Sequence, residues 1–304
     1  MIYTVTLNPA IDVYFTINEP LQEVEVNRAA SQSIKAAGKG INCSLLLDTL
    51  SVPSTAVALL GGFSGAFIKE QLLHRRWIKL SEVCLKEANR INMKLLQKDT
   101  SLSVNASGPH IDEAVKEHLF DCLSSLNDTD FVMINGSMIS GFTQSDLIAL
   151  CHFIKKQNAY LIVDMECLSL ALLKEIQPDL IKPNLYELSL LLKREIHKDT
   201  IQNDLNEILQ HTNSILLSLG ADGAIYCNKH TALRLIQQKI SAVNTVGCGD
   251  ALLAGFISEY ANTRDVVQAM IMGGACGCAH AQDNDGSYEA IKSYFDKLTV
   301  SSIY

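Results

Sequence analysis

Several features that mark other protein classes are missing from this sequence of 304 residues. Lys and Arg number 25 against 33 Asp and Glu, which gives a formal net charge of −8. A chain with a surplus of acid lacks the concentrated positive field that nucleic acids and anionic membranes attract, so neither is an expected partner. No apolar run approaches the length that spans a bilayer, and the start, MIYTVTLNPAID, lacks the basic leader of a signal peptide.

The cysteines and glycines exclude further classes. The nine cysteines form no C-x-x-C pair and lie mostly in apolar runs, so we expect reduced, buried thiols in a cytoplasmic protein. Cys276 and Cys278 are too close for a zinc knuckle, and the glycines beside them predict a closely packed helix. Neither GxxxxGK[ST] nor a strand followed by GxGxxG occurs, which disfavours P-loop nucleotidases and dinucleotide oxidoreductases.

The chain instead alternates short β-branched runs with longer amphipathic segments. The runs cover residues 2–7, 55–60, 131–134, 161–163, 180–181 and 214–219. This rhythm predicts an α/β fold, with a mostly parallel central sheet that helices cover on both faces. Residues 13–17 and 90–106 alternate apolar and polar side chains without a helix, as exposed antiparallel ribbons do. We interpret them as a small inserted β-sheet lid, from segments of about 12–35 and 88–107, on a single domain of residues 1–304.

Polar residues and glycines follow each predicted strand. In chain order they are Asn8 and Asp12, Gly61 and Gly62, Asn135 to Ser137, Asp164, Lys182, and Gly220. Turn chemistry alone explains any one of them. Because ligands of open α/β sheets bind outside the carboxyl ends of the strands, together they indicate one binding edge.

Two glycine-rich segments stand out at this edge. In residues 37–42, glycines open a predicted helix, and Lys39 and Asn42 supply hydrogen-bond donors. In residues 244–250, Gly247-Cys248-Gly249 begins another helix and points backbone N–H groups at one spot, which suits an anion. Asp250 follows directly. A carboxylate there either interacts with the helix dipole or deprotonates a hydroxyl that attacks a bound phosphorus. The presence of an anion-binding helix start directly beside the carboxylate favours the second role.

Seven motifs in order then resemble the ribokinase-like sugar kinases, in their phosphofructokinase B branch. They are TLNPAID (6–12), AAGKGIN (36–42), NRINMKL (89–95), NGS (135–137), KPNLYE (182–187), SLGADG (218–223) and NTVGCGDALLAGF (244–256). The branch includes 1-phosphofructokinase and tagatose-6-phosphate kinase. The resemblance implies a ribokinase-like fold and a kinase that uses ATP and Mg²⁺.

The resemblance also implies residue roles. Asp250 would be the catalytic base, and the N–H groups of Gly247, Cys248 and Gly249 would form an anion hole for the transferred phosphoryl group. Asp12, Gly38, Lys39, Asn42, Arg90 and Ser137 would bind the sugar phosphate, Arg90 by gripping its phosphate, and Arg28 is a further candidate for that grip. Lys182, Asn184, Glu187, Ser218, Gly220, Gly223 and Gly286 would line the nucleotide side, with Asn184 and Glu187 orienting Mg²⁺ through water.

The expected reaction is phosphorylation of a ketohexose monophosphate to a bisphosphate. The first candidate substrate is fructose 1-phosphate, which would give fructose 1,6-bisphosphate. Tagatose 6-phosphate is the alternative. A kinase of a free sugar or nucleoside and a non-catalytic sugar-phosphate sensor are further alternatives. Three departures bear on these alternatives: Met138-Ile139 replaces the usual Leu-Pro, Met165-Glu166 replaces small polar residues, and Cys248 adds a thiol expected to be open to oxidation. Because family lids commonly pack in pairs, we also expect a homodimer joined through the lid.

Overall fold

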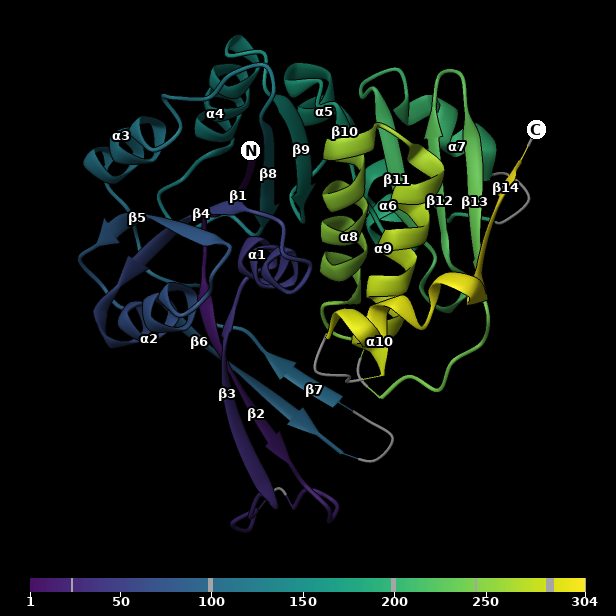
Figure 1. Ribbon diagram of the computed structural model, residues 1–304. Coiled ribbons are helices and arrows are strands. Elements are labelled where there is room, and N and C mark those ends of the chain that lie inside the picture. The colour runs from purple at the N-terminus through teal and green to yellow at the C-terminus, as the bar shows by residue number, and fades with distance from the viewer. Residues whose placement is uncertain (23, 98–100, 198–200, 244, 283–286, 304) are drawn as a thin grey trace.

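A computed structural model describes residues 1–22, 24–97, 101–197, 201–243, 245–282 and 287–303, and it contains two sheets (Figure 1). Across the larger sheet the strands follow the order β14 (Leu298–Ser302), β13 (Ala232–Gln237), β12 (Ala224–Asn228), β11 (Ser214–Ser218), β10 (Leu180–Ile181), β9 (Tyr160–Met165), β8 (Phe131–Gly136), β1 (Ile2–Thr6), β4 (Ser54–Gly61) and β5 (Ile78–Leu85). From β5 to β11 every pair is parallel, and β12 to β14 add an antiparallel edge. The predicted mostly parallel sheet is confirmed.

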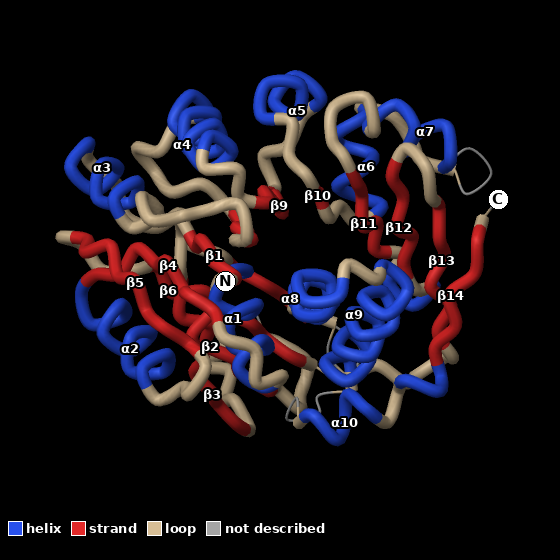
Figure 2. The backbone as a smooth tube through the Cα atoms, turned by 45° about the horizontal axis from the view of Figure 1, so that its top comes forward, coloured by secondary structure: helices blue, strands red, loops and turns tan. Residues whose placement is uncertain are grey.

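Helices cover both faces of this sheet, as expected. One face carries α3 (Glu113–Asp121), α4 (Gln144–Lys156), α5 (Leu170–Ile176), α6 (Leu185–Leu192) and α7 (Ile201–Ile208), and the other carries α1 (Lys39–Thr49), α2 (Gly62–Leu73), α8 (Cys248–Thr263), α9 (Val266–Ala281) and α10 (Tyr288–Lys292). Figure 2 shows the two groups on opposite sides of the strands. In β8, Val132 and Ile134 pack into the first layer and Phe131 and Met133 into the second, because strand side chains alternate between faces. Among the described helices, none has both the length and the apolar character to cross a membrane.

Small residues fix the position of α8. Gly273 and Gly255 lie where α8 and α9 touch, and a Cβ on Gly273 would stand 2.6 Å from the Leu252 carbonyl oxygen. Cys276 and Cys278 lie in the same helix, so the predicted closely packed helix is confirmed. Because only glycine permits this approach, α9 holds α8 rigidly and sets the place of its N-terminus.

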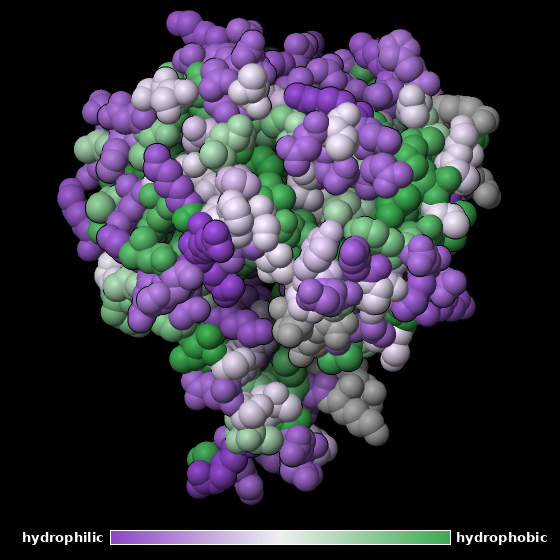
Figure 3. Space-filling model, viewed as in Figure 1, coloured by the Kyte–Doolittle hydropathy of each residue, from purple (hydrophilic) through white to green (hydrophobic). Residues whose placement is uncertain are grey.

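The smaller sheet projects from the main body (Figures 1 and 3). Its order is β3 (Ser31–Ala37), β2 (Ala10–Thr16), β6 (Arg90–Leu96) and β7 (Ser101–Val104). The pairs β2–β3 and β6–β7 are antiparallel, as expected for ribbons. The two ribbons join at the centre of the sheet, where β2 and β6 run parallel. The two pairs belong to different parts of the chain, so no tight turn fixes their relative direction.

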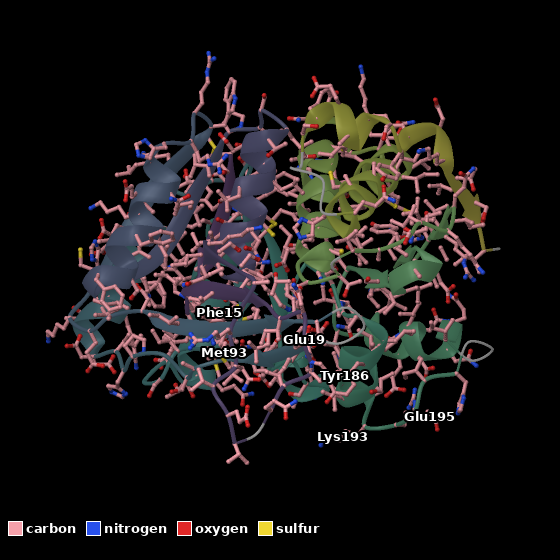
Figure 4. All side chains as sticks on the ribbon, turned by 90° about the horizontal axis from the view of Figure 1, so that it is seen from below. Phe15, Glu19, Met93, Tyr186, Lys193 and Glu195 are labelled. Atoms are coloured by element: carbon pink, nitrogen blue, oxygen red, sulfur yellow. The ribbon has the colours of Figure 1, made fainter. Side chains whose placement is uncertain are left out.

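The two faces of the small sheet differ in character. In β6, Arg90, Asn92 and Lys94 share the face that looks toward the main sheet, and Ile91 and Met93 occupy the other. Apolar side chains continue across this second face, and several are exposed: Ile34, Ile91, Leu102 and Val104. Figure 4 labels Phe15 of β2 and Met93 of β6 on these neighbouring strands. The sheet thus has one polar and one apolar surface.

Candidate active site

Residues at the carboxyl ends of the parallel strands gather below the polar face of the small sheet. Asn8 follows β1, Asn135 lies near the end of β8, and Lys182 follows β10. All three line one cavity of about 310 Å³. This is the binding edge predicted from the sequence. In the described part of the chain, the buried side-chain polar atoms without a hydrogen-bond partner belong to Asn8, Asn135 and Asp164 at this edge and to Arg90 of the small sheet. Buried polar atoms are normally bonded, so the edge is built to receive a polar ligand.

Asp250 lies in the first turn of α8 and is only 6% exposed. Its Oδ2 accepts a hydrogen bond of 2.7 Å from Nδ2 of Asn42 in α1. Burial and the nearby Asp164 carboxylate raise the pKa of Asp250 to about 6, although Asn42, Lys182 and Lys39 oppose the shift. A carboxylate with such a pKa is still ionised at neutral pH and is a stronger base than an exposed one, as proton abstraction requires.

The residues predicted to form an anion hole lie at the start of α8. Gly247 is the N-cap residue with φ +86°, and Gly249 is in the first turn. The N–H of Cys248 donates to the Thr245 carbonyl at 3.3 Å, so this donor is already used within the loop. His280 of α9 holds the loop from the side, with Nε2 lying 2.8 Å from the Val246 carbonyl oxygen. A helix start of this kind suits an anion, and its Cys248 N–H is already bonded within the loop.

The Cys248 thiol differs from the expectation. Burial, together with Cys278 and Asp250, raises the pKa of this thiol to about 11. The reactive species in oxidation is the thiolate, so a raised pKa suppresses that chemistry. The raised pKa of the thiol argues against the expected sensitivity of Cys248 to oxidation.

Two lysines and two carboxylates form an ionic cluster beside Asp250. Lys39 Nζ lies 3.1 Å from Asp164 Oδ1 and 3.5 Å from Glu187 Oε1, and Lys182 Nζ lies 3.5 Å from Asp164 Oδ2. Burial would lower the pKa of Lys39, but the carboxylates of Asp164, Glu187 and Asp250 outweigh it and raise the pKa. Both lysines thus lie among carboxylates where the carboxyl ends of the strands approach the N-terminus of α8.

Asn184 and Glu187 form a capping box at the start of α6. Asn184 Oδ1 accepts from the Glu187 N–H at 2.8 Å, and Glu187 Oε2 accepts from the Asn184 N–H at 2.9 Å. The pair therefore has a structural function at this helix. Glu187 Oε1 faces Lys39, so the carboxylate also belongs to the ionic cluster.

Arg90 spans the gap between the two sheets. Its NH2 donates to the Asn8 carbonyl at 3.0 Å and to Ser137 Oγ at 3.2 Å, and its NH1 donates to the Ala106 carbonyl at 3.1 Å. Its buried Nε has no hydrogen-bond partner within the part of the chain that the structure describes. Both terminal nitrogens of the guanidinium thus donate hydrogen bonds to oxygens of the protein itself.

Asp12 and Gly38 complete the side of the cavity next to the small sheet. Asp12 Oδ1 accepts from Asn92 Nδ2 at 2.8 Å. Gly38 has φ +128°, and a Cβ there would lie 2.8 Å from Thr6 Cγ2. Glycine is needed at this helix entry for both reasons.

A second cavity of about 610 Å³ adjoins the first. The predicted nucleotide residues Ser218, Gly220 and Gly223 line it, together with Cys248. Lys182, Asn184 and Gly249 line both cavities. The smaller cavity is lined by the predicted sugar residues Asp12, Gly38, Lys39, Asn42, Arg90 and Ser137, and also by Glu187, Gly247 and Asp250. The two predicted sets thus meet at the N-terminus of α8.

Some residues fall outside this arrangement. Arg28 is exposed and lines neither cavity, and Gly286 lies outside the described residues. The list of site residues drawn from the sequence omits Asn92, Lys94 and Asn105, which line the smaller cavity. The period of two in NRINMKL was the available signal, because it places Arg90, Asn92 and Lys94 on one face of a strand.

Comparison with known proteins agrees with this geometry. A model of the "pfkB family carbohydrate kinase" matches residues 5–291. The chain is 33% identical to a 1-phosphofructokinase of Borreliella burgdorferi over 100% of this chain and 99% of that protein. It is 31% identical to a D-tagatose-1-phosphate kinase of Bacillus licheniformis over 91% of each. The fold matches phosphofructokinase-2 from Escherichia coli with a TM-score of 0.89 at 22% identity, over 97% of this chain and 98% of that one.

The matched segment includes both cavities and the N-terminus of α8 between them. Sequence, fold and site therefore lead to one assignment: this chain belongs to the pfkB family of carbohydrate kinases.

Proposed function

We propose that this kinase transfers the γ-phosphoryl group of ATP to fructose 1-phosphate and produces fructose 1,6-bisphosphate. The observation that carries the proposal is the position of Asp250. It lines the smaller cavity at the helix N-terminus where the larger cavity begins. A donor in the larger cavity and an acceptor in the smaller one would meet beside a buried base, which is the arrangement that in-line phosphoryl transfer needs.

In this mechanism Asp250 accepts the proton of the sugar 6-hydroxyl as its oxygen attacks the γ-phosphorus. The new O–P bond forms while the bond to the β,γ-bridging oxygen breaks, and ADP leaves with the electron pair. The N–H groups at the start of α8 would stabilise the charge on the phosphoryl oxygens, with Gly249 better placed than Cys248 because the Cys248 N–H is already used. Lys182, which lines both cavities, would neutralise charge on the nucleotide phosphates. Closure of the small sheet as a lid would exclude water.

The donor set fits a hydrated Mg²⁺. Asn184 lines both cavities and Glu187 lines the smaller one, and each offers an oxygen atom. The buried Asp164 Oδ2 lies 3.5 Å from Lys182 Nζ and has no hydrogen-bond partner among the described residues. In the described residues no three metal-binding side chains come together, so Mg²⁺ would be held largely by water and phosphate, as it prefers. Bound there, the ion would neutralise charge on the phosphates. Glu187 and Asn184 would orient it through water, while the capping box keeps both side chains in place.

The substrate assignment rests on the relatives and on the charge of the smaller cavity. The curated relatives are named for kinases of fructose or tagatose derivatives, and the two tagatose enzymes for the 1-phosphate. This favours D-tagatose 1-phosphate over tagatose 6-phosphate as the second candidate. Arg90 and Lys39 line the cavity and suit an anionic sugar better than a free sugar or a nucleoside. Asp250 and the glycines of the anion hole would be unnecessary in a sensor.

A coupled assay of ADP release tests this function. The panel contains fructose 1-phosphate, D-tagatose 1-phosphate, the corresponding 6-phosphates and free fructose, each with ATP and Mg²⁺. We expect kcat/KM for fructose 1-phosphate to exceed that for free fructose at least about 100-fold, because charge-assisted bonds to a phosphate contribute several kcal/mol. Equal turnover of free fructose would contradict the substrate class, and no ADP release with any sugar would favour the sensor.

We further propose a cytoplasmic homodimer. The nine cysteines are all free, which favours a reducing compartment. Ile34, Leu102 and Val104 are exposed on the apolar face of the small sheet, and a second copy of that face would cover them. Contiguous exposed apolar side chains of this kind mark association surfaces.

Light scattering should therefore give the mass of two chains at micromolar concentration, while Leu102→Glu should shift the protein toward the monomer. The matched control Leu73→Glu changes an exposed leucine at the end of α2, away from this face, and should leave the mass unchanged. A monomeric wild-type protein would contradict the dimer.

A further inference from the structure

Lys94 is a charged side chain of the smaller cavity that neither the chemistry above nor the list of sequence-predicted residues uses. It lies on β6, four residues after Arg90, and period-two geometry places Arg90, Asn92 and Lys94 on the same polar face. All three line the cavity that contains Asp250. Lys94 is nevertheless only 8% exposed. A buried ammonium group on the wall of a ligand cavity needs an explanation, because lysine is rarely buried without a partner.

The other buried lysines of the described chain are paired with carboxylates. Lys182 lies 3.5 Å from Asp164, and Lys116 lies 2.8 Å from Glu113 and 2.9 Å from Asp146. Lys94 differs from both. Its Nζ donates to the neutral Asn105 Oδ1 at 2.9 Å, and no carboxylate of the described residues lies within ion-pair distance. A desolvated cation without a counter-charge is unfavourable, and an anionic ligand would supply that charge.

The surrounding bonds hold the Lys94 side chain in position. Asn105 follows β7, and the segment it belongs to is fixed by two other residues of the same face. Asn92 Oδ1 accepts from the Ala106 N–H at 3.2 Å, and Arg90 NH1 donates to the Ala106 carbonyl at 3.1 Å. Lys94 uses one of its three donors on Asn105, which leaves two for a ligand. Arg90, in contrast, already spends both terminal nitrogens on protein oxygens.

The position of Lys94 relative to Asp250 indicates what the ligand is. The hydroxyl that reacts must lie at Asp250, on the helix side of the cavity. In a ketohexose 1-phosphate the 6-hydroxyl and the phosphate are at opposite ends of the carbon chain. With the hydroxyl at α8, the phosphate points toward the small sheet, where Arg90 and Lys94 stand.

We propose that Lys94 binds the phosphate group of the sugar substrate and makes this kinase specific for a phosphorylated ketohexose. The inference rests on the proposed function and adds the residue that selects the substrate class. Lys94 is a substrate-binding residue and takes no part in proton transfer. Its ammonium group complements the two negative charges of the phosphate, whereas a hydroxymethyl group in that place would leave the ammonium unpaired.

Steady-state kinetics of Lys94→Met and Lys94→Arg with the sugar panel tests this. Methionine keeps the length and fills the same volume without charge. We expect Lys94→Met to raise KM for fructose 1-phosphate about 10- to 100-fold, the range of a charged hydrogen bond, while kcat changes little. The turnover of free fructose should not fall, so the preference for the phosphorylated sugar collapses. Lys94→Arg should restore part of it.

Two further variants separate phosphate binding from a merely structural role. Asn105→Ala removes the bond that holds Lys94 but keeps the charge, and it should cost much less than Lys94→Met. Lys35→Met changes an exposed lysine of β3 that lies over the Tyr14 ring and lines neither cavity, and it should leave every KM unchanged. Equal losses in Asn105→Ala and Lys94→Met, or equal losses with free and phosphorylated fructose, would overturn the proposal.

The results that would contradict the role of Lys94 differ from those that would contradict the proposed function. If wild-type enzyme turns over fructose 1-phosphate and Lys94→Met, still folded by its melting temperature, keeps the wild-type KM, then only the role of Lys94 is wrong. If the wild-type enzyme turns over no phosphorylated ketohexose, the proposed function itself is wrong and the role of Lys94 falls with it.

Discussion

Replacing Asp250 with Asn is expected to lower kcat by about 10³- to 10⁴-fold, since a general base of this kind contributes up to that amount. The amide keeps the size of the side chain but cannot accept the proton of the attacking hydroxyl. KM for the sugar should change little, because the binding groups on the small sheet are untouched. The measurement is ADP release under saturating ATP, with sugar affinity from calorimetry. Asp265→Asn is a matched control at the N-cap of α9, where asparagine also caps well, and it should keep full activity.

The pH profile gives an independent check of the same base. The pKa of Asp250 is raised to about 6, and only the ionised carboxylate accepts a proton. kcat/KM of the wild-type enzyme should therefore fall as the pH drops through 6, and the residual activity of Asp250→Asn should lack this decline. Full activity in the variant, or the same acidic limb in both proteins, would show that another group is the base.

Replacing Gly247 with Ala is expected to lower kcat about 100-fold, the typical loss when one donor of an anion hole is displaced. Gly247 has φ +86°, which alanine adopts only with strain, and the new Cβ would stand 2.8 Å from His280 Nε2. His280 also contacts the Val246 carbonyl, so the added methyl pushes against the side chain that holds the loop. The first N–H groups of α8 then move off the phosphoryl position. The measurement is kcat at saturating substrates.

The control for Gly247→Ala is a glycine with the same strain far from the site. Gly141 has φ +87°, and a Cβ there would lie 2.3 Å from the Ile111 carbonyl oxygen. Gly141→Ala should lower the melting temperature while kcat of the folded enzyme is retained. Wild-type kcat in Gly247→Ala would mean that the start of α8 does not act as an anion hole.

The strand ends and helix starts could be predicted because they depend on local sequence. A β-branched run followed by glycine or asparagine indicates both the strand and its turn, and this places Asn135 and Lys182 at one edge. The start of α8 can also be predicted from local sequence, since Gly247 and Asp250 mark it within four residues. The family motifs rest on the same short segments.

Long-range partners could not be predicted in this way. The bond from Asn42 to Asp250 joins residues 208 positions apart, and no periodicity encodes it. The parallel pairing of β2 with β6 likewise depends on how two distant hairpins meet. The antiparallel edge of β12 to β14 was missed because its last strand returns from the C-terminal end of the chain. Nothing in the alternating pattern of residues 90–96 indicates the bond from Lys94 to Asn105.

The alternation of side chains along β6 has a consequence for how this protein tolerates change. Arg90, Asn92 and Lys94 face the cavity, whereas Ile91 and Met93 form the opposite surface. Point substitutions therefore alter one surface and spare the other, so substrate preference and the proposed self-association can drift independently. An insertion or deletion of one residue between positions 90 and 94 exchanges the two surfaces at once. It would bring a methionine or leucine into the cavity and turn a lysine onto the apolar surface. This short strand should accept many replacements and almost no change of length.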